Sequence, residues 1–210
     1  MNRNIYYTTA LCAVALLCVG GASRAQLVSS LTSSIDNGLE SHGVEQAAGQ
    51  FTLTSAATVG SATLSLYDDS HGSSLSDLTA ALFTDSANLP GSLIATSTGS
   101  TGSLVQYATH PVTFTFSNPG LSAGNYWLEL IVAPSSDMIW NGNDTSLTNT
   151  GTDGIVDLQS YSSVFGAQPI GLMFSIDAPL SESSTPEPGP MALLGGFGLA
   201  GLAAARRRRK

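Results

Sequence analysis

The sequence predicts a single antiparallel β-sandwich of jelly-roll type, with an N-terminal signal helix and a C-terminal transmembrane helix. Three observations support this fold: short segments alternate between apolar and polar residues, turn-forming residues separate them, and Ser and Thr are frequent. Ser and Thr account for 47 of the 160 residues at positions 26–185, a content that disfavours helices and suits the solvent side of strands. Many short strands separated by turns are typical of sandwiches and jelly rolls.

The N-terminus has the features of a signal peptide. Arg3 provides a charged start, an apolar core follows, and Ser23-Arg24-Ala25 places small residues where a signal peptidase reads the chain. We therefore expect signal peptidase to remove residues 1–25 by cutting between Ala25 and Gln26.

Alternation with period two marks the strands of the passenger domain, which we place at residues 26–178. Strands are predicted at 51–54, 63–66, 113–116 and 172–176, each with its large apolar residues on one face. Residues 126–132 are apolar on both faces except at Glu129, so we expect a central strand there, with Trp127 facing away from Tyr126. Residues 26–48 fit either an edge strand or a short helix, and residues 141–154 form a long polar loop.

A linker is expected at residues 179–185, too polar and proline-flanked to pack, and a three-part tail follows it. The tail consists of Pro186-Glu187-Pro188, an apolar stretch at 189–205 and the basic cluster Arg206-Arg207-Arg208-Arg209-Lys210. Seventeen apolar residues give about 26 Å of helix, the short end of what spans a bilayer of about 30 Å. The positive-inside rule leaves the basic cluster in the cytoplasm, so the chain before the tail lies outside it.

This tail resembles the PEP-CTERM sorting signal of Gram-negative bacterial surface proteins, over residues 184–210. The resemblance implies an exported protein that is transiently anchored in the inner membrane. An exosortase-type enzyme then cuts it and passes it to the cell surface or extracellular matrix, where exopolysaccharide of a biofilm is an expected neighbour. A permanent anchor without processing is the alternative, but a plain anchor does not need Pro-Glu-Pro at its border.

The passenger domain resembles the choice-of-anchor domains, most closely those of type R. Three segments carry this resemblance: Leu82 to Gly91, Phe114 to Phe116, and Leu121 to Leu128. It covers residues 27–178 and implies a secreted β-sandwich. The family has no assigned reaction, so no functional residues carry over from it.

Charged residues divide sharply between the ends and the middle of the chain. All seven Lys and Arg lie at positions 3, 24 and 206–210, and all fifteen Asp and Glu lie between 26 and 205. Removing the seven cations changes the formal net charge from −8 to −15. A passenger without fixed cations cannot clamp phosphate, so nucleic acid is excluded and anionic membranes are disfavoured. Its carboxylates need His, backbone N–H groups or bound cations, of which extracellular calcium is the obvious candidate.

Two polar clusters are weak candidates for calcium. The first contains Asp68, Asp69, His71 and Asp77, and the second contains Asn141, Asn143, Asp144, Asp153 and Asp157. Oxygen ligands on turns suit calcium, but neither cluster has EF-hand spacing, so solvated turns are the simpler explanation. Asp68 and Asp69 are adjacent and would point to opposite faces of a strand, which makes them a poor glycosidase pair.

Aromatic residues provide a second binding hypothesis, a platform for sugar rings. Trp140 lies where a strand meets a loop, and with Tyr161 it is our candidate for glycan binding. The expected place of both tryptophans, Trp127 and Trp140, is nevertheless the core. An exposed aromatic surface beside amides would indicate a glycan-binding module, whereas a surface of Ser and Thr over buried tryptophans would indicate a structural protein.

The sequence does not favour an enzyme. Both cysteines lie in the signal segment, the passenger has no lysine, and no Gly-x-Ser-x-Gly elbow occurs. The three histidines, at 42, 71 and 110, lack metal spacing, and His110 should be extended and exposed because Pro111 follows it. We predict a non-enzymatic surface or matrix protein associated with exopolysaccharide and without a cofactor. The alternative is a carbohydrate-binding module of jelly-roll type, with or without stabilising calcium.

Overall fold

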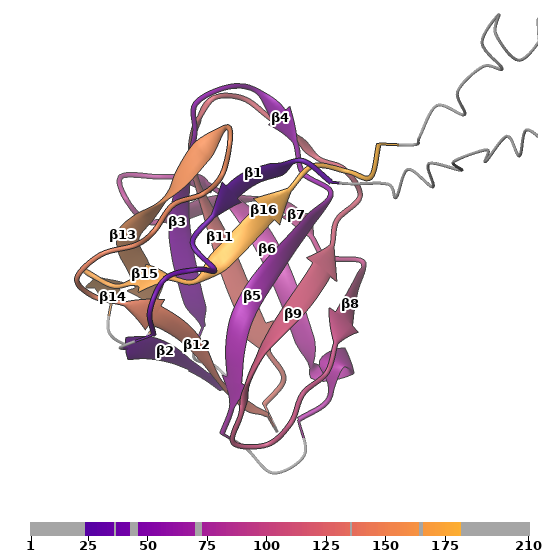
Figure 1. Ribbon diagram of the computed structural model, residues 1–210, viewed down its shortest axis with the longest axis vertical. Helices are drawn as coiled ribbons and strands as arrows, with labels where there is room; N and C mark the ends of the chain where they lie inside the picture. The colour runs from indigo at the N-terminus through magenta and orange to yellow at the C-terminus, as the bar shows by residue number, and fades with distance from the viewer. Residues whose placement is uncertain are drawn as a thin grey trace, which may run out of the picture. The chain divides into compact units, whose positions relative to one another are not determined.

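The computed structural model describes residues 24–35, 37–42, 46–69, 73–134, 136–163 and 166–181, which fold mainly into antiparallel strands (Figure 1). An eight-stranded sheet contains β1 (Gln26–Ser29), β2 (Asn37–His42), β5 (Ser61–Asp68), β8 (Gly99–Gly102), β9 (Thr109–Thr115), β12 (Asp137–Asn143), β15 (Gly171–Leu172) and β16 (Phe174–Asp177). A six-stranded sheet contains β3 (Ala47–Leu53), β6 (Leu78–Asp85), β7 (Pro90–Thr96), β11 (Gly124–Val132), β13 (Gly154–Ser162) and β14 (Gly166–Gln168). A small sheet pairs β4 (Ala57–Thr58) with β10 (Gly120–Leu121), and η1 (Leu75–Asp77) is a 3₁₀ turn. The prediction of an all-β, antiparallel fold is confirmed.

Each large sheet has one apolar face because side chains alternate along its strands. In β5, Leu64 and Leu66 are fully buried, whereas Thr63 between Ala62 and Leu64 is partly exposed. In β11, Leu128 and Leu130 join the same core cluster. The two apolar faces pack against each other, as in a sandwich, and enclose the core between the sheets.

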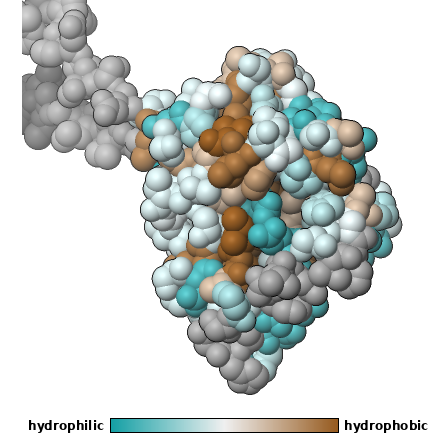
Figure 2. Space-filling view, turned by 180° about the vertical axis from the view of Figure 1, so that it is seen from behind, coloured by the Kyte–Doolittle hydropathy of each residue, from teal (hydrophilic) through white to brown (hydrophobic). Residues whose placement is uncertain are grey.

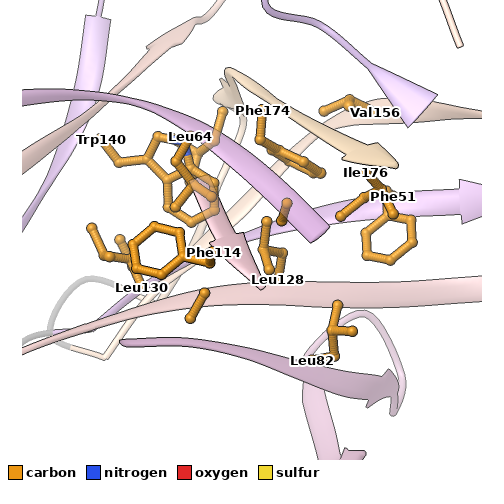
Figure 3. Packing of buried hydrophobic residues seen from close by; sticks show 14 of the residues in the cluster. Phe51, Leu64, Leu82, Phe114, Leu128, Leu130, Trp140, Val156, Phe174 and Ile176 are labelled. Atoms are coloured by element: carbon orange, nitrogen blue, oxygen red, sulfur yellow. The ribbon is translucent and has the colours of Figure 1, made fainter. Parts of the chain in front are cut away.

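Three aromatic rings from both sheets form the centre of this core (Figure 3). Phe174 of β16 meets Phe51 of β3 edge-on at 6.0 Å between ring centroids, and it meets Trp140 of β12 at 5.6 Å. Edge-to-face pairs of this kind contribute about 0.5–1.5 kcal/mol beyond their buried area. Gly49 makes room for them, because a Cβ at this position would lie 2.9 Å from the Phe174 ring.

The eight-stranded sheet divides beyond β5. On one side, β9 pairs with β5 and β8 pairs with β9. On the other side, β16 pairs with the first half of β5 and with β1, and β12 pairs with the end of β5 and with β2. Residues 172–176, predicted as one strand, are two short strands on either side of Met173. The Met173 N–H donates to the Asn141 carbonyl at 2.8 Å, and the Met173 carbonyl accepts from the Ser65 N–H at 3.0 Å.

The six-stranded sheet has the order β14-β13-β3-β11-β6-β7. Strand β11 lies between β3 and β6, so the prediction of a central strand at 126–132 is confirmed. Residues 26–48 contribute β1, β2 and the start of β3, so the described part of this segment contains strands rather than a helix. The polar loop is shorter than predicted, because residues 141–143 belong to β12.

The domain that these strands build runs from Ser23 to Ser181 as one compact unit. Pro179, predicted to lie in an unpacked linker, packs closely on Gly60: a Cβ on that glycine would lie 2.5 Å from the Pro179 Cα. Most of the signal segment, the sorting tripeptide, the helix predicted at 189–205 and the basic cluster lie outside the described residues. Within the described ranges, no helix is long and apolar enough to cross a membrane.

Candidate functional site

Trp140 cannot serve as a sugar-stacking residue, so this glycan-binding prediction is wrong. The side chain is 0% exposed, and its indole Nε1 donates to the Met173 carbonyl at 3.0 Å. The local sequence looked like the junction of a strand and a loop, but β5 and β2 flank this strand on its two sides. Trp127 is also 0% exposed, but it is not part of the core cluster, so the expectation of a core position is confirmed for Trp140 and not for Trp127.

The first group of calcium candidates is spread over separate structural features. Asp68, at the end of β5, is 3% exposed, whereas its neighbour Asp69 is exposed. Asp77 caps η1: its Oδ2 accepts from the Ser74 N–H at 3.0 Å and from the Ser136 hydroxyl at 3.1 Å. In the residues that the structure describes, which do not include position 71, no three potential ligands of the His, Cys, Asp or Glu type form a metal-binding group.

The second group of calcium candidates is organised by Asn143, whose side chain holds a turn. Its Oδ1 accepts from the Thr145 N–H at 2.9 Å and from the Ser146 N–H at 2.7 Å, and its Nδ2 donates to the Ser34 carbonyl at 3.0 Å. Asn143 is 1% exposed, so its oxygen and nitrogen are committed to the fold. Asp144, the next residue, is exposed and lies in the loop that this turn begins.

His110 lies in β9 and is extended, as predicted from the proline that follows it, but it is half-buried rather than exposed. Its Nε2 is buried without a hydrogen-bond partner. The register pairs His110 with Leu66, a core residue, so the ring lies at the border of the core. This environment explains why the expectation of an exposed histidine is wrong.

The outer face of the six-stranded sheet, meaning its side turned away from the core, gathers large and polar side chains. Cross-strand pairing arranges them in three rows: Ile155, Thr52 and Asn125; then Gln50, Trp127, Phe83 and Leu93; then Tyr161, Ala48, Glu129 and Ala81. Figure 2 shows the molecule from this side, with apolar side chains in a broken stripe next to hydrophilic ones. We take this outer face as the candidate functional site.

Asp85, the last residue of β6, ties three strands of the outer face together. Its Oδ1 accepts from Trp127 Nε1 at 2.8 Å and from Gln50 Nε2 at 2.9 Å. Gln50 belongs to β3 and Trp127 to β11, so one carboxylate oxygen joins three neighbouring strands. Gln50 is 4% exposed, and hydrogen bonds to an ionised acceptor that are shielded from water are stronger than neutral ones.

Thr52, Asn125 and Asp157 form a second polar group on the outer face. The Thr52 hydroxyl lies 2.9 Å from Asn125 Oδ1 and 3.0 Å from Asp157 Oδ2, but it has one proton to donate. The other hydrogen must come from a protonated Asp157, a turned Asn125 amide or a donor outside the protein. Burial raises the pKa of Asp157, and the Thr52 hydrogen bond lowers it in part.

Glu129 lies in the same face, in the middle of β11, and is 7% exposed. Its cross-strand neighbours are Ala48 and Ala81, whose methyl groups offer its carboxylate no hydrogen bond. No hydrogen bond to the Glu129 side chain is present in the described structure. Burial accordingly raises the pKa of Glu129, because the charged form loses hydration without gaining a partner.

The described residues contain one Lys or Arg, and it lies on the other sheet. The Arg24 guanidinium donates to the Ser61 hydroxyl of β5. Burial raises the pKa of Asp177, and the nearby Arg24 charge and a Ser175 hydrogen bond oppose this rise. In the described structure, the outer face of the six-stranded sheet therefore holds carboxylates, amides and hydroxyls but no fixed cation.

Sequence reasoning found part of this site. It placed Trp127 opposite Tyr126 on a central strand, and it named Tyr161, which is half-buried in the third row. It missed Gln50 and Asp85, because their contacts join strands far apart in the chain. One usable signal was present in the sequence: the alternation in β11 places Trp127 and Glu129 on the solvent-facing side of that strand, where polar partners such as Gln50 and Asp85 should be sought.

Comparison with models of known protein families finds no match, and comparison with curated proteins finds none either. The functional argument therefore depends on the residues and the geometry of this chain.

Proposed function

We propose that this chain is an exported, non-enzymatic component of a bacterial cell surface or extracellular matrix, sorted through its C-terminal tail. The observation that carries the proposal is the tail itself: Pro186-Glu187-Pro188, an apolar stretch and a terminal basic cluster follow, after residues 182–185, on a sandwich whose described part ends at residue 181. In this proposal a signal peptidase and an exosortase-type enzyme process the two ends. The passenger comes to lie beside exopolysaccharide.

The domain supports a structural or adhesive task. Both tryptophans are buried, and the outer face of the eight-stranded sheet is lined by short hydroxyl side chains, such as those of Thr63 and Thr113. A surface of this kind is well hydrated and offers no positively charged group that could bind the phosphates of a nucleic acid. Removal of residues 1–25 would also remove Arg24, the cation of the described domain.

The finer topology that we propose is a jelly roll. The order β2-β12-β5-β9 in one sheet and β3-β11-β6-β7 in the other supports it. Along the chain, successive members of these two sets alternate between the sheets except at the hairpin of β6 and β7, as the winding of a jelly roll requires.

A carbohydrate-binding module is the second candidate function. The outer face of the six-stranded sheet favours it, because the aromatic ring of Tyr161 shares this face with the side-chain amides of Gln50 and Asn125. The two candidates are compatible, since a matrix protein can bind the polymer that surrounds it.

Intact mass of the surface-exposed and released protein tests the sorting proposal, with the native tail and with Glu187→Ala. We expect the native protein to lack both residues 1–25 and the end of the tail, and Glu187→Ala to retain its full tail in the membrane. Glu182→Ala, four residues before the tripeptide, is the matched control and should be processed normally. A native mass that ends at Lys210 would mean that the tail is only an anchor.

A further inference from the structure

We propose that the outer face of the six-stranded sheet binds a neutral polysaccharide laid across β13, β3, β11 and β6. The inference rests on the proposed function in one respect: an extracellular location would supply the polymer. It names the ligand class and moves the glycan site from Trp140 to the other sheet. Four features of this face support it.

The first feature is a group of solvent-accessible hydrogen-bonding side chains around Thr52. Thr52 has one proton for the oxygens of Asn125 and Asp157, at 2.9 and 3.0 Å. Asn125 is exposed, so its amide and the neighbouring carboxylate can be reached from solvent. Sugar hydroxyls both donate and accept, so they can pair with these amide and carboxylate groups without bringing a charge.

The second feature is Glu129, whose residue is 7% exposed and whose carboxylate makes no hydrogen bond in the described structure. Its carboxylate oxygens still reach solvent at this face, so a ligand hydroxyl can replace the water that hydrates them. It shares the outer face with the Thr52 group, two rows further along β11. A hydroxyl that approaches this face finds an acceptor that the protein itself leaves unused.

The third feature is exposed apolar surface on both sides of the polar groups. Ile155 of β13 is 47% exposed and Leu93 of β7 is 57% exposed, with the half-buried Phe83 next to Leu93 in the same row. The C–H faces of sugar rings pack on aliphatic and aromatic side chains of this kind. From β13 to β7 the face crosses five strands, which at a spacing of about 4.8 Å measure roughly 19 Å. This length suits an extended polymer better than a single sugar.

The fourth feature is the charge of the face, which decides between classes of polymer. Asp85, Asp157 and Glu129 are acidic, and no Lys or Arg of the described structure lies near them. An anionic polymer would be repelled and would find no cation to pair with. A cationic peptide is the competing partner, because ammonium groups also donate to carboxylates. The exposed apolar side chains on both sides favour the polysaccharide, whose sugar rings can pack on them.

The test measures binding of the purified full-length protein in detergent to hydroxyethyl cellulose, laminarin, dextran and galactomannan. Alginate serves as an anionic polymer and polylysine as a cationic one. The site variant is Asn125→Ala with Ile155→Ala. Its matched control is Thr101→Ala with Val105→Ala, which likewise removes one exposed polar and one exposed apolar side chain, on or near β8. Near-UV circular dichroism establishes that each variant is folded, and Ile155→Thr is a milder second variant that keeps the β-branched shape.

We expect at least one neutral polysaccharide to bind, with affinity reduced about tenfold or more by the site variant and less by Ile155→Thr, and the matched control to bind like the native protein. Binding to none of the neutral polymers, equal losses in the site variant and its control, or binding to polylysine alone would overturn the proposal. Glu187→Ala should bind normally, so a failure of sorting and a failure of glycan binding remain distinguishable.

Discussion

The outer faces of the two sheets follow the same alternation but carry different chemistry. On the eight-stranded sheet, short side chains pair with each other: the Thr63 and Thr113 hydroxyls lie 2.8 Å apart, and the Asn141 amide donates to Ser65. On the six-stranded sheet, the corresponding positions hold Trp127 and Glu129, both almost fully buried. The alternation of side chains along a strand determines which side of the sheet faces solvent. The size of those side chains and the hydrogen bonds they can make determine whether that side is simply hydrated or forms a binding site.

The largest expected difference comes from Trp127→Ala. Because Trp127 is fully buried although it lies outside the core, we expect its loss to lower the free energy of unfolding by about 3–5 kcal/mol, as for a core aromatic residue. Urea unfolding followed by near-UV circular dichroism measures this loss, with Trp140→Ala as the core reference. A loss below about 1 kcal/mol would show that the outer face of the six-stranded sheet is an ordinary solvent face.

The next effect concerns the carboxylate that joins β3, β11 and β6. Asp85→Ala leaves the Trp127 and Gln50 donors without their acceptor, and we expect a loss of about 2–4 kcal/mol, since each unsatisfied buried donor costs about 1–3 kcal/mol. Urea unfolding measures this loss as well. Asp69→Ala, at an exposed position next to the other sheet, serves as the control. Equal losses in both variants would contradict the proposal that the Asp85 carboxylate holds the three strands together.

A pH-dependent effect should separate Glu129 from the hydroxyls of the other sheet. Burial raises its pKa in the folded state, so the folded protein binds the proton more tightly than the unfolded chain. This stabilisation is fully present below the unfolded pKa of about 4.3 and is lost as pH rises through the folded pKa. We expect Glu129→Gln to unfold at higher urea concentration than the native protein at pH 8, with the difference vanishing toward pH 4. A pH-independent difference would refute this explanation.

The smallest effect is expected on the eight-stranded sheet. Thr113→Val removes one hydroxyl of the pair with Thr63, and we expect a change of about 1 kcal/mol or less, independent of pH between 4 and 8. Valine keeps the β-branched shape, so strand packing is unchanged. A loss as large as that of Asp85→Ala would erase the contrast between the two faces.

The sequence predicted the elements that local patterns determine. Alternation in 63–66 and 113–116 placed β5 and β9, and the apolar run at 126–132 placed the central strand, because side-chain phase is a local property. Local patterns could not decide between the core and a sugar-binding surface for Trp140, because its burial depends on β2 and β5, which precede it by many residues. Asp85 and Gln50 were missed for the same reason: the bonds that unite them exist only once β3, β11 and β6 lie side by side.

Carboxyl footprinting with a carbodiimide, in the presence and absence of the best-binding neutral polysaccharide, tests the contrast between the two faces most directly. We expect the polymer to protect Asp157 on the six-stranded sheet and to leave the exposed Asp69 and Asp144 labelled as before. Protection of Asp69 or Asp144 without protection of Asp157 would contradict our account and would place the binding surface elsewhere on the domain.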